Sequence, residues 1–240
     1  MPDAVPLTLW DHAFALVTFL LLPAYSTRSI GLVLEKIRKE GEPARIWAYR
    51  QTILTWLSLT VILIAMWSAL GRDWAAIGFQ FPDTGPLIVG LAASALFLAV
   101  ILTPLRNLST SDVSAQDFEQ QLGKVAILLP RSSKEGSWFL RLSVNAGITE
   151  EIIFRGYLIW YLQHFLPLLW SAVIAAVLFG LGHLYQGVRQ LPGLLLVSAV
   201  AVTLYVYTES LLVPIILHIV LDALQGRFFV DFYQKQSTAR

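Results

Sequence analysis

The chain carries the sequence EEIIFR at residues 150–155, inside an otherwise apolar stretch that runs from about Trp138 to Leu169. Ionisable groups at membrane depth cost free energy, so they face a protein-lined cavity and commonly mark a functional site. Two later apolar segments each bring a histidine, His183 and His218, and Asp222 follows the second histidine after four positions. Three separate hydrophobic segments are therefore predicted to supply acid–base groups to one site.

The composition places these groups in a membrane protein. Of 240 residues, 56% are hydrophobic and 14% are charged, whereas soluble domains carry roughly 25% charged residues. The formal net charge of +1 and the scattered basic residues argue against a nucleic-acid partner. The chain has no cysteine, which excludes disulfides and thiolate chemistry. Any chemistry must therefore use oxygen and imidazole groups.

Seven apolar segments are long enough to cross a membrane, since a hydrocarbon core about 30 Å thick needs roughly 20 apolar residues per helix. The first lacks the basic start and the cleavage site of a signal peptide, so we expect it to be retained. We predict an all-α fold, a polytopic membrane helix bundle in one domain, 1–240, with N-terminal helices in 1–135 and the catalytic core in 136–228. The predicted spans are Leu9–Tyr25, Thr52–Leu70, Pro86–Pro104, Trp138–Phe165, Pro167–Tyr185, Leu191–Tyr207 and Leu211–Phe228.

Two connections between these spans are predicted to hold interfacial helices. Residues 29–40 place four apolar side chains on one helical stripe, which is typical of a helix lying in the membrane interface; they are Ile30, Val33, Leu34 and Ile37. An ordinary solvated loop helix is the alternative. The connection from Arg106 to Gly136 offers a second stripe, made of Phe118, Leu122 and Val125.

Lysine and arginine predict the orientation, because short cytoplasmic loops are enriched in these residues. Fifteen of the 17 lie on one side of the predicted bundle, whereas Arg72 lies on the other side and Arg155 lies inside a helix. We therefore expect an integral membrane protein with its N terminus outside and its C terminus in the cytoplasm. The acid–base groups then meet in a cavity open toward the cytoplasm or the inner leaflet. His12 and His164, at helix ends near the outer face, are predicted to have no catalytic role.

Helical spacing separates the two glutamates. Glu151 and Arg155 are four positions apart, close enough for an ion pair, whereas Glu150 is turned by about 100° from that face. Glu150 is therefore the freer carboxylate and suits general-base work on water. His218 and Asp222 have the same spacing, so the aspartate can accept a hydrogen bond from the ring. The alternative is that all these groups are polar contacts that hold the bundle together.

The three motifs together resemble those of the CAAX-protease and bacteriocin-processing family, which includes the type II CAAX prenyl endopeptidase. The resemblance rests on Glu-Glu-x-x-x-Arg at 150–155, Phe-x-x-x-His at 179–183 and His-x-x-x-Asp at 218–222, in this order, and on flanking stretches over about residues 140–225. In the family the last position is often asparagine, and here it is Asp222.

The resemblance implies an intramembrane endopeptidase of the glutamic type. Glu150 and His183 would activate a water for attack on the scissile carbonyl, and His218 with Asp222 would stabilise the oxyanion. Supporting positions would be Glu151, Arg155 and Phe179. No cofactor is implied, and metal-independent hydrolysis is favoured over zinc, because the His-Glu-x-x-His pattern of zinc proteases does not occur in the sequence.

The expected partners are the lipid bilayer and a membrane-associated protein or peptide that is cleaved near its terminus. A prenylated carboxyl terminus, a bacteriocin or pheromone peptide and a sorting helix all fit. Two hypotheses of other classes stay open. An immunity or scaffold protein would use the motifs to bind a partner without cleaving it. A proton-coupled transporter would also use buried glutamate and histidine, although no internal repeat is visible.

Overall fold

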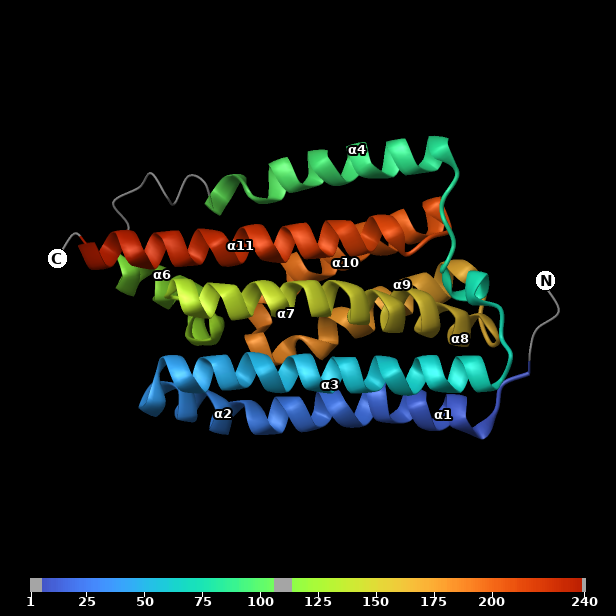
Figure 1. Cartoon of the computed structure of the whole chain (residues 1–240), viewed down its shortest axis with the longest axis horizontal. Coiled ribbons are helices and arrows are strands. Elements are labelled where there is room, and N and C mark those ends of the chain that lie inside the picture. Colours follow the sequence, from blue (N-terminus) through green and yellow to red (C-terminus); the bar gives the residue numbers. More distant parts are fainter. Residues whose placement is uncertain (1–5, 106–113, 239–240) are drawn as a thin grey trace.

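The computed structural model describes residues 6–105 and 114–238, which form helices joined by short connections. The helices run along one common axis, and the first helix begins at the end of the bundle opposite to that at which the last helix ends (Figure 1). The predicted fold class, a polytopic all-α bundle, is confirmed. Residues 106–113, at the start of the predicted long connection, and Arg240 lie outside the described residues.

Six helical stretches in the described residues are long and apolar enough to cross a membrane. They are Leu9–Glu40, Glu42–Ala69, Thr84–Leu105, Leu168–Gln186, Val188–Thr208 and Leu212–Gln236. The predicted span Trp138–Phe165 is also helical, but Glu150, Glu151 and Arg155 make it less apolar. It is formed by α7 (Ser133–Glu151), the π-helix η4 (Ile152–Leu158) and α8 (Ile159–Gln163).

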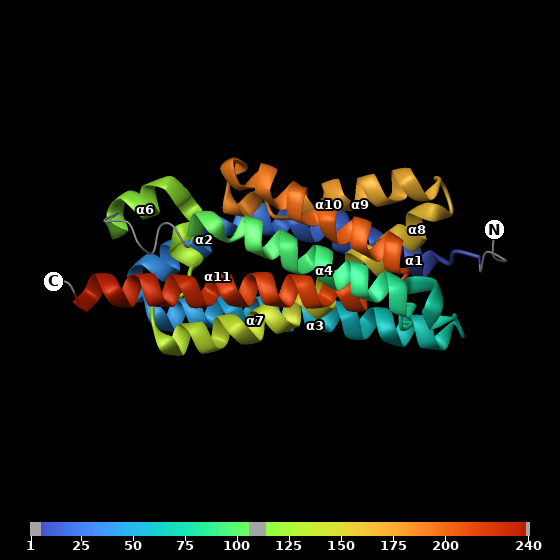
Figure 2. The ribbon, with the colours of Figure 1, turned by 90° about the horizontal axis from the view of Figure 1, so that it is seen from above.

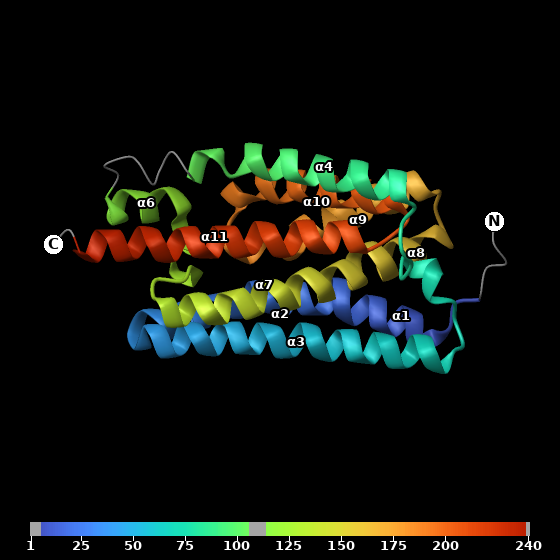
Figure 3. The same cartoon turned by 45° about the horizontal axis from the view of Figure 1, so that its top comes forward.

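Neighbouring helices shield the charged residues of this span from lipid. α7 lies between α3 (Glu42–Ala69) and α11 (Leu212–Thr238), and it packs against both (Figures 1 and 3). α4 (Thr84–Ile101) lies on the far side of α11 (Figure 1). The charged motif thus lies in the part of this helix that protein encloses, since Glu150, Glu151 and all seven residues of η4 are buried.

The predicted interfacial helix over residues 29–40 is not a separate element. α1 (Leu9–Leu16), the π-helix η1 (Val17–Leu21) and α2 (Leu22–Glu40) form one continuous helix. Pro23 lies inside this continuous helix directly after the π-helical turn η1, and such local π adjustments let membrane helices tolerate the missing N–H of a proline. The end comes at Gly41, whose φ of +69° favours glycine. The predicted stripe exists, but Leu34 and Ile37 are buried against protein instead of lipid.

The second predicted interfacial helix is the short α6 (Ala115–Leu122), followed by the 3₁₀-helix η3 (Gly123–Leu128). Phe118 of its predicted stripe is buried against Phe229 and Phe232 of α11. Leu122 packs beside this cluster and Val125 is half-buried. The stripe therefore docks α6 on the end of α11.

Glycines let α7 and α11 approach closely. At Gly147 an added Cβ would lie 2.5 Å from Cγ1 of Ile219, far below a normal contact distance. An added Cβ at Gly136 would also clash with Val230 of α11, and one at Gly226 would clash with Phe139 of α7. Small residues of this kind allow close packing of membrane helices. The contact holds the part of α11 that carries His218 against the end of α7.

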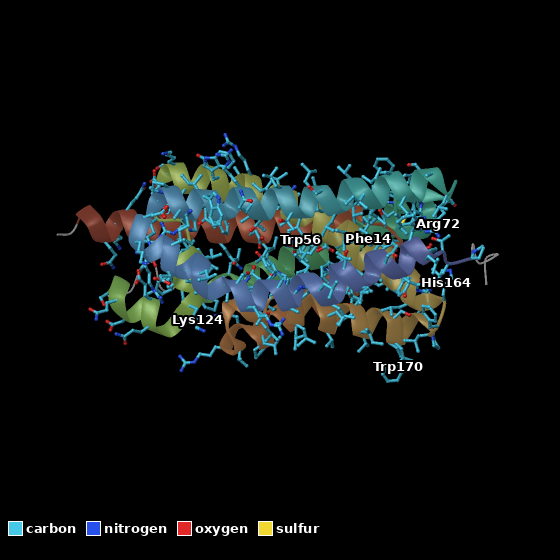
Figure 4. The ribbon with its side chains drawn as sticks, turned by 90° about the horizontal axis from the view of Figure 1, so that it is seen from below. Phe14, Trp56, Arg72, Lys124, His164 and Trp170 are labelled. Atoms are coloured by element: carbon cyan, nitrogen blue, oxygen red, sulfur yellow. The ribbon has the colours of Figure 1, made fainter. Side chains whose placement is uncertain are left out.

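A buried ion pair fastens α1 to the end of α3. Arg72 donates from its two terminal nitrogens to the two carboxylate oxygens of Asp11, at 2.6 and 2.7 Å. Its guanidinium also lies over the rings of Trp67 and Trp160. Arg72 lies at the same end of the bundle as His164, and Lys124 lies at the opposite end (Figure 4).

Candidate active site

Three helices bring the predicted acid–base groups together. Glu150 and Glu151 are the last residues of α7, and Arg155 lies in η4, which directly continues it. His183 follows α9 (Leu168–Gly182), and α11 carries His218 and Asp222. All seven residues of η4 are buried. π-Helical turns are frequent at functional sites, where the wider turn re-aims side chains.

Glu151 is the centre of the hydrogen-bond network. Its Oε1 accepts from Nη1 of Arg155 at 2.9 Å, which is the ion pair expected from the spacing. The same oxygen lies 2.7 Å from Nδ1 of His218. The Glu151 side chain is fully buried, with 0% of the residue exposed. This carboxylate is therefore committed to two partners and holds η4 and α11 together.

Arg155 also contacts α9 and the next helix. Its Nη2 donates to Oγ of Ser198 at 3.0 Å, and its guanidinium lies 4.4 Å from the centre of the Phe179 ring. Ser198 belongs to α10 (Leu191–Thr208) and was not predicted, since a lone serine in an apolar helix gives no sequence signal. Phe179 also contacts His183, with ring centres 4.6 Å apart.

His183 faces Glu150 with an unprotonated nitrogen. Its Nδ1 lies 2.8 Å from the backbone oxygen of Phe179, and because a carbonyl only accepts, Nδ1 carries the proton of the neutral ring. Its Nε2 is then an acceptor and lies 3.9 Å from Oε2 of Glu150. That separation is too long for a direct hydrogen bond.

His218 is held differently from the prediction. The expected hydrogen bond to Asp222 is not formed, because Nε2 and Oδ2 are 3.6 Å apart, whereas Nδ1 bonds to Glu151. The interhelical partner is closer than the partner on the same helix, because the close contact of α7 with α11 brings Glu151 to the ring. Both ring nitrogens face carboxylates, so His218 acts as a donor, in contrast to His183.

Asp222 is the most exposed of these groups. Side-chain exposure is 6% for Glu150, 15% for His183 and 32% for Asp222. His12 and His164, predicted to have no role, lie elsewhere: His12 contacts the hydroxyl of Tyr161, three residues before His164 near the end of α8.

Among the described residues, no three histidine, aspartate or glutamate side chains are arranged to hold a metal ion. The two histidines each use one ring nitrogen for a protein acceptor, and the Phe179 ring contacts both. The site thus contains two facing acceptors, Glu150 and Nε2 of His183, and one donor, His218.

The fold and the cluster together define a polytopic helical membrane protein with a buried glutamate–histidine site. Residues 133–224 match the family model described as Rce1-like, type II CAAX prenyl endopeptidase. The match runs from the start of α7 into α11 and contains every candidate site residue. The resemblance predicted from the three motifs is confirmed over this part of the chain, and it indicates protease activity. No curated protein and no solved structure matches the chain.

Proposed function

We propose that this protein is an intramembrane endopeptidase in which Glu150 and His183 activate a water molecule. The observation that carries the proposal is the 3.9 Å separation between Oε2 of Glu150 and Nε2 of His183. Both atoms are acceptors, so one water can donate a hydrogen bond to each, at the usual length of about 2.8 Å. The water oxygen then keeps a lone pair for attack on a carbonyl carbon.

The reaction that follows is ordinary peptide hydrolysis. As the water oxygen bonds to the carbonyl carbon, Glu150 takes one of its protons as general base. The carbonyl oxygen becomes an oxyanion, which a hydrogen bond from Nε2 of His218 stabilises. The carbon–nitrogen bond then breaks, Glu150 returns the proton to the leaving amine, and a carboxylic acid and an amine are released.

We propose that this hydrolysis is independent of metal. The sequence lacks the His-Glu-x-x-His pattern of zinc proteases, and the paired acceptors of Glu150 and His183 can orient the water without an ion. Purified protein should therefore keep its activity through prolonged treatment with a strong zinc chelator. Loss of activity on chelation and its return on adding zinc would overturn this part of the proposal.

We place the site on the cytoplasmic side of a bacterial inner membrane. The end of the bundle that holds Lys124 would face the cytoplasm and the end that holds Arg72 would face outward (Figure 4). Fifteen of the 17 lysine and arginine residues support this orientation. A substrate would then reach the site from the cytoplasm or the inner leaflet.

The decisive experiment is cleavage by the purified protein in detergent or liposomes. The substrates are a fluorogenic peptide ending in farnesyl-cysteine, two aliphatic residues and methionine, the same peptide without the farnesyl group, and a hydrophobic helical peptide. Wild type should cleave at least one, and Glu150→Gln should be slower by about 10²- to 10⁴-fold, because an amide cannot accept the proton. Preference for the farnesylated peptide would assign a prenylated substrate. Equal cleavage by wild type and Glu150→Gln would overturn the proposal.

A further inference from the structure

Tyr185 lies beside the candidate site but belongs to none of the three motifs. It stands on the 3₁₀-turn η5 (Leu184–Gln186), two residues after His183. Its ring centre is 5.9 Å from that of His183. The negative charges of Glu150 and Asp222 act on its hydroxyl. The ring thus lies beside His183, whose Nε2 faces the proposed base Glu150.

The backbone of the turn fixes the position of this ring. The N–H of Gln186 donates to the backbone oxygen of His183 at 2.9 Å, and the N–H of Gly187 donates to that of Leu184 at 2.9 Å. Gly187 adopts a φ of +111°, which favours glycine. α2 packs against η5. Along the long axis of the bundle, the turn between α9 and α10 lies nearer the middle than the turn between α2 and α3 (Figure 2). Tyr185 is thus held at the depth of the site.

The hydrogen bonding of the hydroxyl leaves its proton available. The side-chain amide of Gln186 donates from Nε2 to the Tyr185 oxygen at 3.2 Å. The phenol keeps its own O–H at neutral pH and is one donor as well as an acceptor. This O–H, close to the water-activating pair, can donate a hydrogen bond to an oxygen of the substrate that becomes negatively charged. His218 is the other donor of the candidate site.

We propose that Tyr185 is a further catalytic residue, whose O–H donates a hydrogen bond to the carbonyl oxygen of the scissile bond as that oxygen becomes an oxyanion. The inference rests on the proposed endopeptidase function. No proton is transferred from Tyr185 in this step: the hydroxyl stabilises the charge, and the proton of the attacking water goes to Glu150. Together with His218, the site then has two donors for the oxyanion.

Tyr185→Phe tests this with minimal disturbance, because the ring and its contact with His183 remain. Loss of one oxyanion donor lowers kcat by about 10²-fold or more. An interaction made only in the transition state lowers kcat and kcat/KM equally, so KM should stay within about twofold. The pH–rate profile should keep its shape, since no titrating group of the mechanism is removed. A ring that only packs against His183 would leave kcat unchanged.

A transition-state analogue supplies a readout that a structural role would not move. A phosphinic analogue of the farnesylated peptide carries a tetrahedral centre with an anionic oxygen. Its affinity should fall for Tyr185→Phe by about the factor lost in kcat/KM. In a Glu150→Gln background, the affinity for the uncleaved peptide should not change. Equal affinity of wild type and Tyr185→Phe for the analogue would overturn the inference.

Two further variants complete the test. Tyr207→Phe is the matched control, because this tyrosine of α10 is 51% exposed and lies outside the site; its kinetics should equal wild type. Gln186→Met removes the donor that orients the hydroxyl and should give a loss smaller than that of Tyr185→Phe, which keeps the inference testable if Tyr185→Phe fails to fold. If wild type cleaves a peptide and folded Tyr185→Phe has the same kcat, the role of Tyr185 is refuted and the endopeptidase proposal stands. A wild type inactive on all three peptides would overturn both proposals.

Discussion

Nδ1 of His218 lies 2.7 Å from Oε1 of Glu151, closer than Nε2 of the same ring lies to Asp222, at 3.6 Å. The residue that orients His218 is therefore on another helix, and it is the same residue that neutralises Arg155. Glu150, one position earlier in the chain, faces His183. Adjacent glutamates thus serve opposite halves of the site, one as scaffold and one as proposed base.

The first prediction separates these two glutamates by stability. Glu151→Gln leaves Arg155 as a buried cation without its counter-charge, and breaking a buried ion pair costs about 3–5 kcal/mol. The variant should melt at a lower temperature and turn over more slowly per folded molecule, because His218 loses its anchor. Glu150→Gln should lose activity and keep its melting temperature. A stable, inactive Glu151→Gln beside an active Glu150→Gln would show that the two roles are exchanged.

The second prediction concerns Asp222. Its side chain is 32% exposed and its contact with Nε2 of His218 is long, and an amide oxygen can also accept from that nitrogen. Asp222→Asn should therefore retain activity within about tenfold of wild type, whereas His218→Ala removes the oxyanion donor and should lose about 10²- to 10³-fold in kcat. Steady-state kinetics with the cleaved peptide measure both. A larger loss for Asp222→Asn than for His218→Ala would assign the main role to the aspartate.

The third prediction tests the close contact of α7 with α11. In Gly147→Ala the new Cβ would lie 2.5 Å from Cγ1 and 3.0 Å from the backbone N of Ile219, so α11 must shift. Overpacking of this kind costs about 1–3 kcal/mol, and the shift moves His218 away from Glu151. Both thermal stability and kcat should fall. Gly31→Ala is the control, since its Cβ meets nothing within 4 Å, and it should behave as wild type.

The fourth prediction concerns the buried pair of Asp11 and Arg72. Asp11→Asn or Arg72→Gln alone leaves one buried charge unpaired, which costs about 3–5 kcal/mol. The double variant should be less destabilised than the sum of the two, which thermal unfolding of all four proteins in detergent would show as a coupling energy. Turnover per folded molecule should stay unchanged in the single variants. Strictly additive losses would mean that the two side chains do not interact.

The fifth prediction is the orientation. A reporter fused after Arg240 should be active in its cytoplasm-dependent form and silent in its periplasm-dependent form, because the lysine and arginine bias places this end inside. The same pair of reporters fused after Arg72 should give the opposite result. Periplasmic activity at Arg240 would refute the orientation and the inward-facing site.

Hydrophobic patterning alone predicted the helical segments and the fold class, because crossing a bilayer requires long apolar helices whatever their neighbours are. The ion pair of Glu151 with Arg155 also followed from the sequence, since spacing along one helix is a local property. Helix boundaries were predicted less well. α3 begins at Glu42 instead of Thr52, and α11 extends to Thr238, because charged residues at the helix ends are helical while lying outside the hydrocarbon region.

Contacts between helices were decided by the tertiary structure. The bond of His218 to Glu151, the approach of Ser198 to Arg155 and the facing of His183 toward Glu150 all join residues distant in the chain. The pairing of Asp11 with Arg72 is of the same kind. The sequence determined which polar groups lie inside the membrane, since burying a charge is costly wherever it occurs. Which of them meet depended on the packing of α7 against α11, and that packing depends on shape complementarity at glycines, which no local pattern encodes.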